Sequence, residues 1–380
     1  MMGTLIGWWM YELTKDAFYI GLIGLAEAVP AVVLALYAGY RVDRTQKRRM
    51  LLQTVTLFGC CAFVLLLIST RQFSLLYGTG IAITLIYVVI FSTGVIRAFS
   101  GPAFGAIIAS LVPRERLLTA SQLSSTSWLV ASISGHALAG FMIAWLHVTG
   151  TFLVILLLII LGFVFLWQLK ARPPAVSGNK RTLEEVGEGL RFVFQTKEIL
   201  GALSLDLFAV LFGGAVAMVP VYASAILHVG PIGFGWLNAA TDIGTIITVL
   251  GLTVYPMRRR QGIKLLLAVG GFGLCIIIFA LSKWYWLSFL ALMISGLLDG
   301  VSVVVRGNIV QMKTPDALRG RVLSVNSMFI NSSNEIGQFE SGFAARAMGV
   351  VPSVVFGGCM TLLVVVFTWI KAPTLRKMEY

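Results

Sequence analysis

Acidic side chains inside long apolar stretches are the first candidates for chemistry in this sequence. Glu335 lies near the middle of one such stretch, and Glu27, closely followed by Pro30, lies in another. Asp206 and Asp242 lie in two more. A carboxyl group in surroundings of low dielectric constant can take up or release a proton as its access to water changes. We therefore predict that these acids line a cavity or couple the protein to proton movement; a structural hydrogen bond or internal salt bridge is the alternative.

Polar side chains accompany Glu335 at helical spacing. In a helix, Glu335 would lie about 40° around the axis from Asn331, while Glu340 would lie on the other side and be structural. Six polar side chains facing lipid would be costly, so we expect their shared face to line a cavity or a helix contact. These six are Ser324, Ser327, Asn331, Asn334, Gln338 and Ser341.

Three further charges inside apolar stretches are candidates for a gate. Asp299 and Arg306 are seven residues apart and would share a helix face. Arg97 occupies the position equivalent to Asp299 in the internal repeat described below. We predict an ion pair between Arg97 and Asp299 that joins the two halves of the chain, with separate partners inside each half as the alternative.

The composition shows what kind of element must position these groups. Apolar residues make up 58% of the 380 residues and charged residues 12%, against about 25% charged in soluble domains. This excludes a soluble enzyme, a disordered chain and a secreted disulfide-rich module. Backbone groups in lipid need internal hydrogen-bond partners, so we predict an all-α polytopic membrane protein. The expected spans are 3–13, 18–40, 50–69, 75–99, 117–146, 151–169, 199–227, 232–255, 262–281, 284–305, 319–350 and 353–370.

The first span is shorter than a membrane crossing. Its roughly 11 residues rise about 16 Å as a helix, whereas the apolar core of a bilayer is about 30 Å thick. We expect that the start of this helix is missing from the sequence. No basic segment or small-residue cleavage site precedes Gly3, so the segment does not resemble a signal peptide.

The basic residues predict the orientation. When alternate loops are assigned to two sides, 23 of the 29 Lys and Arg residues lie on one side, three on the other and three inside spans. The positive-inside rule places the basic side, with both termini, in the cytoplasm. The net charge of +13 is thus spread over short loops that face anionic lipid headgroups, which argues against nucleic-acid binding.

A long polar stretch and an internal repeat divide the chain into halves. We expect helix bundles at 1–169 and 199–380, joined by a cytoplasmic linker at 170–198 that holds an amphipathic helix on the membrane surface. A shift of 202 positions places span 75–99 on span 284–305, and Gly140 on Gly342. Both members of each pair cross the membrane in the same direction, which indicates a parallel repeat about an axis normal to the bilayer.

The loop after the second span carries a recognisable pattern of a glycine, an Asp-Arg pair and a basic cluster. It resembles the signature loop of the major facilitator superfamily, with Gln46 and Arg41 as departures. An acid here can pair with a basic residue or with a helix N-terminus in one state and release it in another. The resemblance therefore implies a conformational latch. The alternative is a basic loop that only sets the membrane orientation, in which the single acid has no role as a latch. The latch residues are Gly39, Asp43, Arg44, Lys47 and Arg48.

A second pattern is more specific. It begins at Asp299, continues through the Arg319-Gly-Arg321 segment and ends with Asn334-Glu335-Ile-Gly-Gln338-Phe-Glu340-Ser-Gly342. It resembles the enterobactin exporter-like branch of the superfamily, also called transmembrane secretion effectors. The resemblance covers nearly the whole chain. It implies a twelve-helix transporter of two six-helix bundles with pseudo-two-fold symmetry and alternating access. It does not identify the substrate, because the branch includes both siderophore and drug exporters.

Together these observations predict a proton-driven exporter of a small molecule in the bacterial inner membrane, acting as a monomer. The three histidines and four cysteines lack metal-ligand spacing, and no phosphate-binding loop occurs, so we expect no metal, no cofactor and no enzymatic activity. Two alternatives remain: a lipid transporter or flippase of the same fold, and a non-transporting membrane receptor.

Overall fold

The structure is a computed structural model that describes residues 1–113, 116–169, 182–255, 257, 260–315, 318–376 and 378. These residues form helices and no strand, in agreement with the predicted fold class. The helices of the first half are α1 (Met2–Thr14), α2 (Ala17–Arg44), α3 (Lys47–Ile68), α4 (Arg71–Leu111) and α5 (Leu117–Trp167). Then follow α6 (Thr182–Gln195), α7 (Lys197–Phe212), η2 (Ala215–Met218), α8 (Val219–Val221), η3 (Tyr222–Ile226), α9 (Pro231–Val254), α10 (Gln261–Leu281), α11 (Tyr285–Lys313), α12 (Arg319–Met348), α13 (Val350–Lys371) and α14 (Pro373–Arg376).

Nine helical segments in the described part of the chain are long and apolar enough to cross a membrane. One of them, α5, has 51 residues and would be about 75 Å long if straight, more than twice the apolar thickness of a bilayer. It breaks at His147, where φ is 56°, and therefore makes two crossings. With the short helix α1 and the polar helix α12 added, the segments correspond to the twelve predicted spans.

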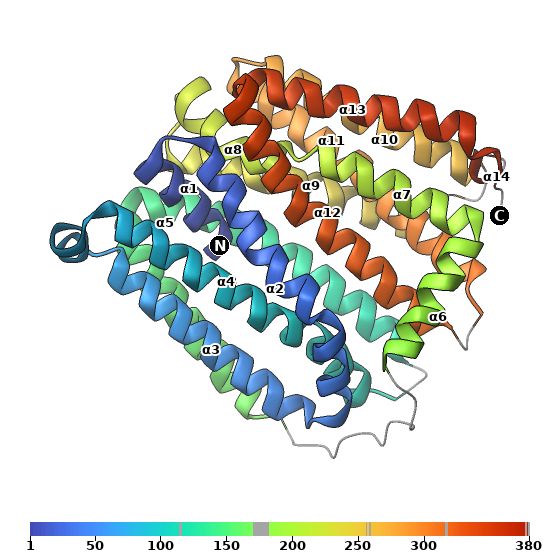
Figure 1. Cartoon of the computed structure of the whole chain (residues 1–380), viewed down its shortest axis with the longest axis horizontal. Coiled ribbons are helices and arrows are strands. Elements are labelled where there is room, and N and C mark those ends of the chain that lie inside the picture. Colours follow the sequence, from blue (N-terminus) through green and yellow to red (C-terminus); the bar gives the residue numbers. More distant parts are fainter. Residues whose placement is uncertain are drawn as a thin grey trace.

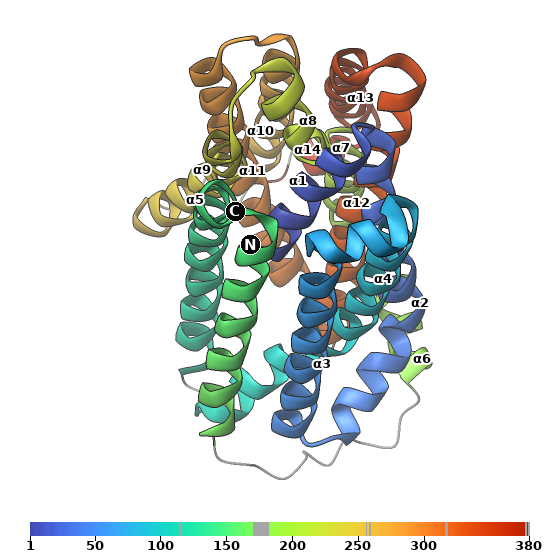
Figure 2. The ribbon, with the colours of Figure 1, turned by 90° about the vertical axis from the view of Figure 1, so that its left-hand side faces the viewer.

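The helices form two bundles, which we call the first bundle (α1–α5) and the second bundle (α7–α13). Figure 1 shows α2 and α12 side by side where the bundles meet. A second contact joins α5 and α9, and Figure 2 shows these two helices next to each other. The structure thus agrees with the predicted pair of helix bundles.

The apolar cores show that the bundles are joined at one end. We call the basic end the one at which α2 ends at Arg44 and α12 begins at Arg319. One large core cluster lies at the opposite end and includes residues of both bundles, such as Ile86 and Phe279. At the basic end the described residues form two separate clusters, one around Met50 in the first bundle and one around Leu265 in the second. Apolar packing therefore holds the bundles together at the opposite end.

Two glycine pairs allow the bundles to approach each other closely. A methyl group on Gly21 of α2 would lie 2.9 Å from Cα of Gly342 on α12. Equally, one on Gly235 of α9 would lie 2.9 Å from Cα of Gly140 on α5. Gly140 and Gly342 are the residues that the repeat superimposes, so the two contacts are related by the pseudo-two-fold axis. Both pairs lie toward the opposite end, and any larger side chain there would push the helices apart.

The linker contains a helix, α6, as the periodicity of the stretch predicts. We expected it to lie on the membrane surface, but its second half packs on protein. Val193 is fully buried against residues of α7 and α10, and Glu188 pairs with Arg321 at the start of α12. Residues 170–181 lie outside the described part of the chain.

Candidate functional site

Arg97 on α4 lies between two carboxylates that belong to different bundles. Its Nη1 is 2.5 Å from Oε1 of Glu27 on α2 and 3.3 Å from Oε1 of Glu335 on α12. Glu27 and Arg97 belong to the first bundle, whereas Glu335 belongs to the second. The structure therefore brings together three of the residues singled out from the sequence, and the ion pair with Glu335 ties the bundles to each other.

The two carboxylates of this cluster differ in their surroundings. The side chain of Glu335 is 7% exposed and that of Glu27 is 24% exposed. Oε2 of Glu335 is buried and has no hydrogen-bond partner among the described residues. Two carboxylates thus share one guanidinium, and a proton on either carboxylate would leave the arginine to the other.

Small residues allow the three helices to approach each other at this point. A Cβ on Gly24 of α2 would lie 2.6 Å from the carbonyl oxygen of Glu335. A Cβ on Gly94 of α4 would lie 2.6 Å from the carbonyl oxygen of Glu27. Glu27 is ten residues from the start of α2, or about 15 Å along the helix, which places the cluster near the middle of the membrane.

The polar face of α12 is divided by its contact with α2. Gln338 contacts α2 at Gly24, and Glu335 is buried one turn nearer the basic end. Asn331 and Asn334 lie still closer to the basic end, and both are exposed. Asn334 donates a hydrogen bond from Nδ2 to the carbonyl oxygen of Ile330, 3.0 Å away within the helix. The buried part of the face is therefore a helix contact, and the two asparagines lie beyond it.

A second polar bridge between the bundles was not predicted. It lies on the other side of the molecule, between α1, α5 and α9. His136 Nδ1 lies 2.7 Å from Oγ1 of Thr4, and its Nε2 lies 3.6 Å from Oδ2 of Asp242. Ser132 donates a hydrogen bond of 2.6 Å to the same carboxylate oxygen. Asp242 belongs to the second bundle, whereas its partners belong to the first, so this network also spans the contact between bundles.

The repeat contained the information needed to find this second bridge. The shift of 202 positions places His136 on Gln338 and Ser132 on Asn334. These α5 residues are therefore the pseudo-symmetric counterparts of the polar face on α12. Considered only as possible metal ligands, the histidines showed no pattern, and for that reason His136 was missed.

The remaining intramembrane charges form a pair inside the second bundle. Arg306 on α11 pairs with Asp206 on α7, and their side chains are 5% and 9% exposed. The predicted pair between Arg97 and Asp299 is not present, because Arg97 contacts Glu27 and Glu335 instead. Among the ion pairs of the described residues, Asp299 takes part in none. Arg306 therefore joins two neighbouring helices of one bundle, as in the alternative with separate partners.

The predicted latch lies at the basic end, where α2 turns into α3. Gly39 and Asp43 are in α2, and the side-chain environment at both positions lies outside the described part of the structure. Lys47 donates a hydrogen bond of 2.7 Å to the carbonyl oxygen of Val42, and Arg48 donates one of 2.5 Å to that of Trp167. These two bonds tie the loop to α2 and to the end of α5, within the first bundle.

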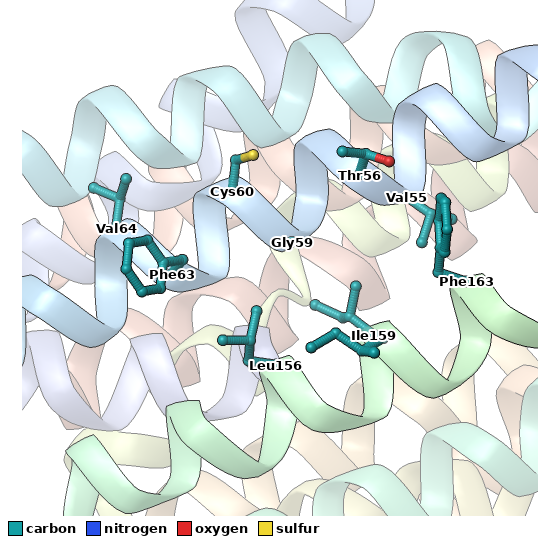
Figure 3. Close-up of a pocket in the computed structure, with 10 residues that line it drawn as sticks. Val55, Thr56, Gly59, Cys60, Phe63, Val64, Leu156, Ile159 and Phe163 are labelled. Carbon is teal, nitrogen blue, oxygen red and sulfur yellow. The ribbon is translucent and has the colours of Figure 1, made fainter.

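An apolar groove lies away from these polar clusters. It has a volume of about 440 Å³ and runs between α3 and the second crossing of α5. Figure 3 shows Phe63 of α3 and Leu156, Ile159 and Phe163 of α5 along it. The groove contains no charged lining residue among those described, so it is unsuited to ion coupling.

Comparison with known proteins agrees with this fold. The sequence profile of the family described as transmembrane secretion effector matches residues 2–380. Two relatives, the enterobactin exporters of Shigella boydii serotype 18 and of Escherichia coli O81, are each 23% identical over 390 residues. In both cases the match covers 99% of this chain and 89% of the relative.

Solved structures with the same arrangement of helices include two transporters. A D-xylose-proton symporter superimposes with a TM-score of 0.73 at 15% identity, covering 100% of this chain and 97% of the symporter. A bacterial homologue of the human lysosomal transporter Spinster, in an inward-facing conformation, superimposes with a TM-score of 0.71 at 15% identity, covering 98% of this chain and 92% of that protein. At these identities the likeness concerns the fold alone.

Proposed function

This chain belongs to the transmembrane secretion effector family of the major facilitator superfamily, and from that premise we propose that it is a proton-driven exporter. It moves a small molecule across the bacterial inner membrane by alternating access, with both termini in the cytoplasm. The two bundles, 1–169 and 199–380, rock against each other as a monomer, and residues 170–198 connect them.

The observation that carries the proposal is the sharing of Arg97 by Glu27 and Glu335. A proton that reaches Glu335 neutralises its carboxylate, and Arg97 then stays with Glu27 in the first bundle. The ion pair between the bundles is lost, and separation at the opposite end becomes easier. For a pH gradient to drive export, Glu335 takes up the proton while the opposite end is open and releases it at the basic end, and this release restores the pair.

The distribution of apolar packing supports a conformation open toward the basic end. The shared core and both glycine pairs lie toward the opposite end, whereas the cores at the basic end are separate. By the positive-inside rule the basic end faces the cytoplasm. The cargo would then enter from the cytoplasm in this state, and Asn331 and Asn334 would be available to bind it.

The second bridge would act together with the first. Asp242 is held by Ser132 and His136 across the α5–α9 contact, and this contact must also separate when the opposite end opens. The Asp43 loop would act at the basic end, where closure must follow. The two bridges would thus form when the opposite end is closed, and the bonds of the Asp43 loop would form when the basic end is closed.

The cargo that we propose is a siderophore or a drug-like compound, and the relatives named enterobactin exporters support the first of these. We propose to test this with enterobactin and the dye Hoechst 33342 in proteoliposomes that contain the purified chain. An imposed pH gradient should drive accumulation of at least one of them. Glu335→Gln should abolish the driven accumulation and retain exchange of labelled for unlabelled cargo, because exchange needs no net proton movement.

The matched control is Glu340→Gln, which removes a carboxyl group from the same helix but outside the Arg97 cluster. It should keep driven transport. If Glu335→Gln transports as well as the unchanged protein under a pH gradient, Glu335 is not the coupling residue. If neither compound moves with any gradient while binding is retained, the chain is a receptor.

A further inference from the structure

A cavity in the second bundle has the lining of a lipid site rather than that of a transport pathway. It has a volume of about 420 Å³ and lies between α7 and α13 at the basic end. Its lining includes Lys197, Leu200 and Ser204 of α7, together with Phe367 and Lys371 of α13. Figure 1 shows α13 on the side of the second bundle that faces away from α3 and α4. The cavity is therefore separate from the contact between the bundles.

The two lysines lie at the same level of the membrane. Lys197 is the first residue of α7 and Lys371 is the last residue of α13, so both are at the basic end. The neighbouring Glu198 lies 4.0 Å from Lys313 on α11, and Arg376 lies over the ring of Trp369. Among the described lining residues none is acidic. Two lysines thus line the cavity, and no described lining residue carries a carboxylate.

Deeper in the membrane the same faces become apolar. Phe367 is one turn below Lys371 and is 64% exposed. Phe208 lies on the same face of α7 as Lys197, three turns further along, and is 44% exposed. Basic pockets between helices on the cytoplasmic side of membrane proteins bind anionic lipid headgroups. A free phosphate ion would use the lysines but not the apolar surface below them.

We propose that this cavity binds one anionic phospholipid. The phosphate lies between Lys197 and Lys371, and an acyl chain follows Leu200, Phe367 and Phe208. The lipid joins the first turn of α7 to the last turn of α13. This inference goes beyond the transport function, since it requires only that the helices span a membrane.

The test is native mass spectrometry of the full chain in detergent, titrated with dioleoylphosphatidylglycerol or dioleoylphosphatidylcholine. We expect one saturable phosphatidylglycerol and weaker binding of phosphatidylcholine. Lys197→Gln/Lys371→Gln should lower the affinity for phosphatidylglycerol about twenty-five-fold, the product of roughly five-fold for each lysine. The control Lys264→Gln/Lys283→Gln removes the same charge elsewhere and should bind like the unchanged protein.

Two further measurements separate the lipid from a free anion. Ser204→Phe fills the cavity and keeps both lysines, so it should lose phosphatidylglycerol while its thermal unfolding is retained. Inorganic phosphate should not displace the lipid; displacement at equal concentration would overturn the proposal in favour of a phosphate site. Equal binding by the lysine variant and the control would also overturn it. No gradient or cargo is used, so a failure of the transport proposal leaves this result independent.

Discussion

Glu335→Gln should shift the balance between the two states of the protein even in the absence of cargo. The substitution keeps the shape of the side chain and removes its charge. Arg97 then retains only Glu27, its partner in the first bundle. The contact between α4 and α12 loses its electrostatic part, and we expect a larger share of molecules separated at the opposite end.

The size of the shift follows from the geometry. For unit charges 3.3 Å apart, Coulomb's law gives about 1.3 kcal/mol at the dielectric constant of water and about 5 kcal/mol at an effective value of 20. The side chain of Arg97 is 46% exposed, so solvent screening favours the lower figure. We expect about 1–2 kcal/mol, which changes the ratio of the two states about five- to thirty-fold.

Distances between spin labels can measure this ratio. The labels would be placed on Lys15→Cys, next to α1, and Lys283→Cys, next to α11, in a background without the four native cysteines. Both positions are at the opposite end, one on each bundle. Glu335→Gln should transfer population from the short to the long distance.

The matched control is Glu340→Gln, which should leave the distance distribution unchanged. A distribution for Glu335→Gln that is identical to that of the unchanged protein would refute the reasoning, because the ion pair would then contribute nothing to closure. An equal shift in both variants would point to a general effect of polarity on α12.

Three further perturbations test other contacts. Gly342→Leu should prevent closure of the opposite end, since its side chain would collide with the backbone at Gly21; the same spin labels should show only the long distance. Asp206→Asn should lower the stability of the second bundle by about 3–5 kcal/mol, because it leaves Arg306 buried without its charge partner, and Asp206→Leu/Arg306→Met should recover most of the loss in thermal unfolding. His136→Ala should weaken the second bridge by about 1 kcal/mol and shift the label distances in the same direction as Glu335→Gln, but to a smaller extent; no shift would mean that this bridge is passive.

The chemistry of each segment was enough to predict an all-helical membrane protein and to single out several polar and acidic residues inside its spans. Apolar stretches of membrane length must become helices, because lipid offers the backbone no hydrogen-bond partners. The polar character of α12 and the acids at Glu27 and Glu335 stood out for the same reason, since such groups are costly in lipid. The repeat predicted that Gly140 and Gly342 are equivalent, and their contacts in the structure agree.

The chemistry of each segment could not predict which charged groups form ion pairs with each other. Arg97 was expected to pair with Asp299, but the rotation and crossing of α2, α4 and α12 place it between Glu27 and Glu335 instead. His136 gained its role only through the packing of α5 against α9.

Sequence alone thus determined that this chain is a bundle of membrane helices with acids inside, because burial of apolar surface and backbone hydrogen bonding are properties of each segment. Tertiary structure alone decided which charges meet and at which end the bundles touch. Ion pairs and glycine contacts form between residues far apart in the chain, and their distances depend on how helices are rotated and crossed. Those angles come from the packing of all the helices together.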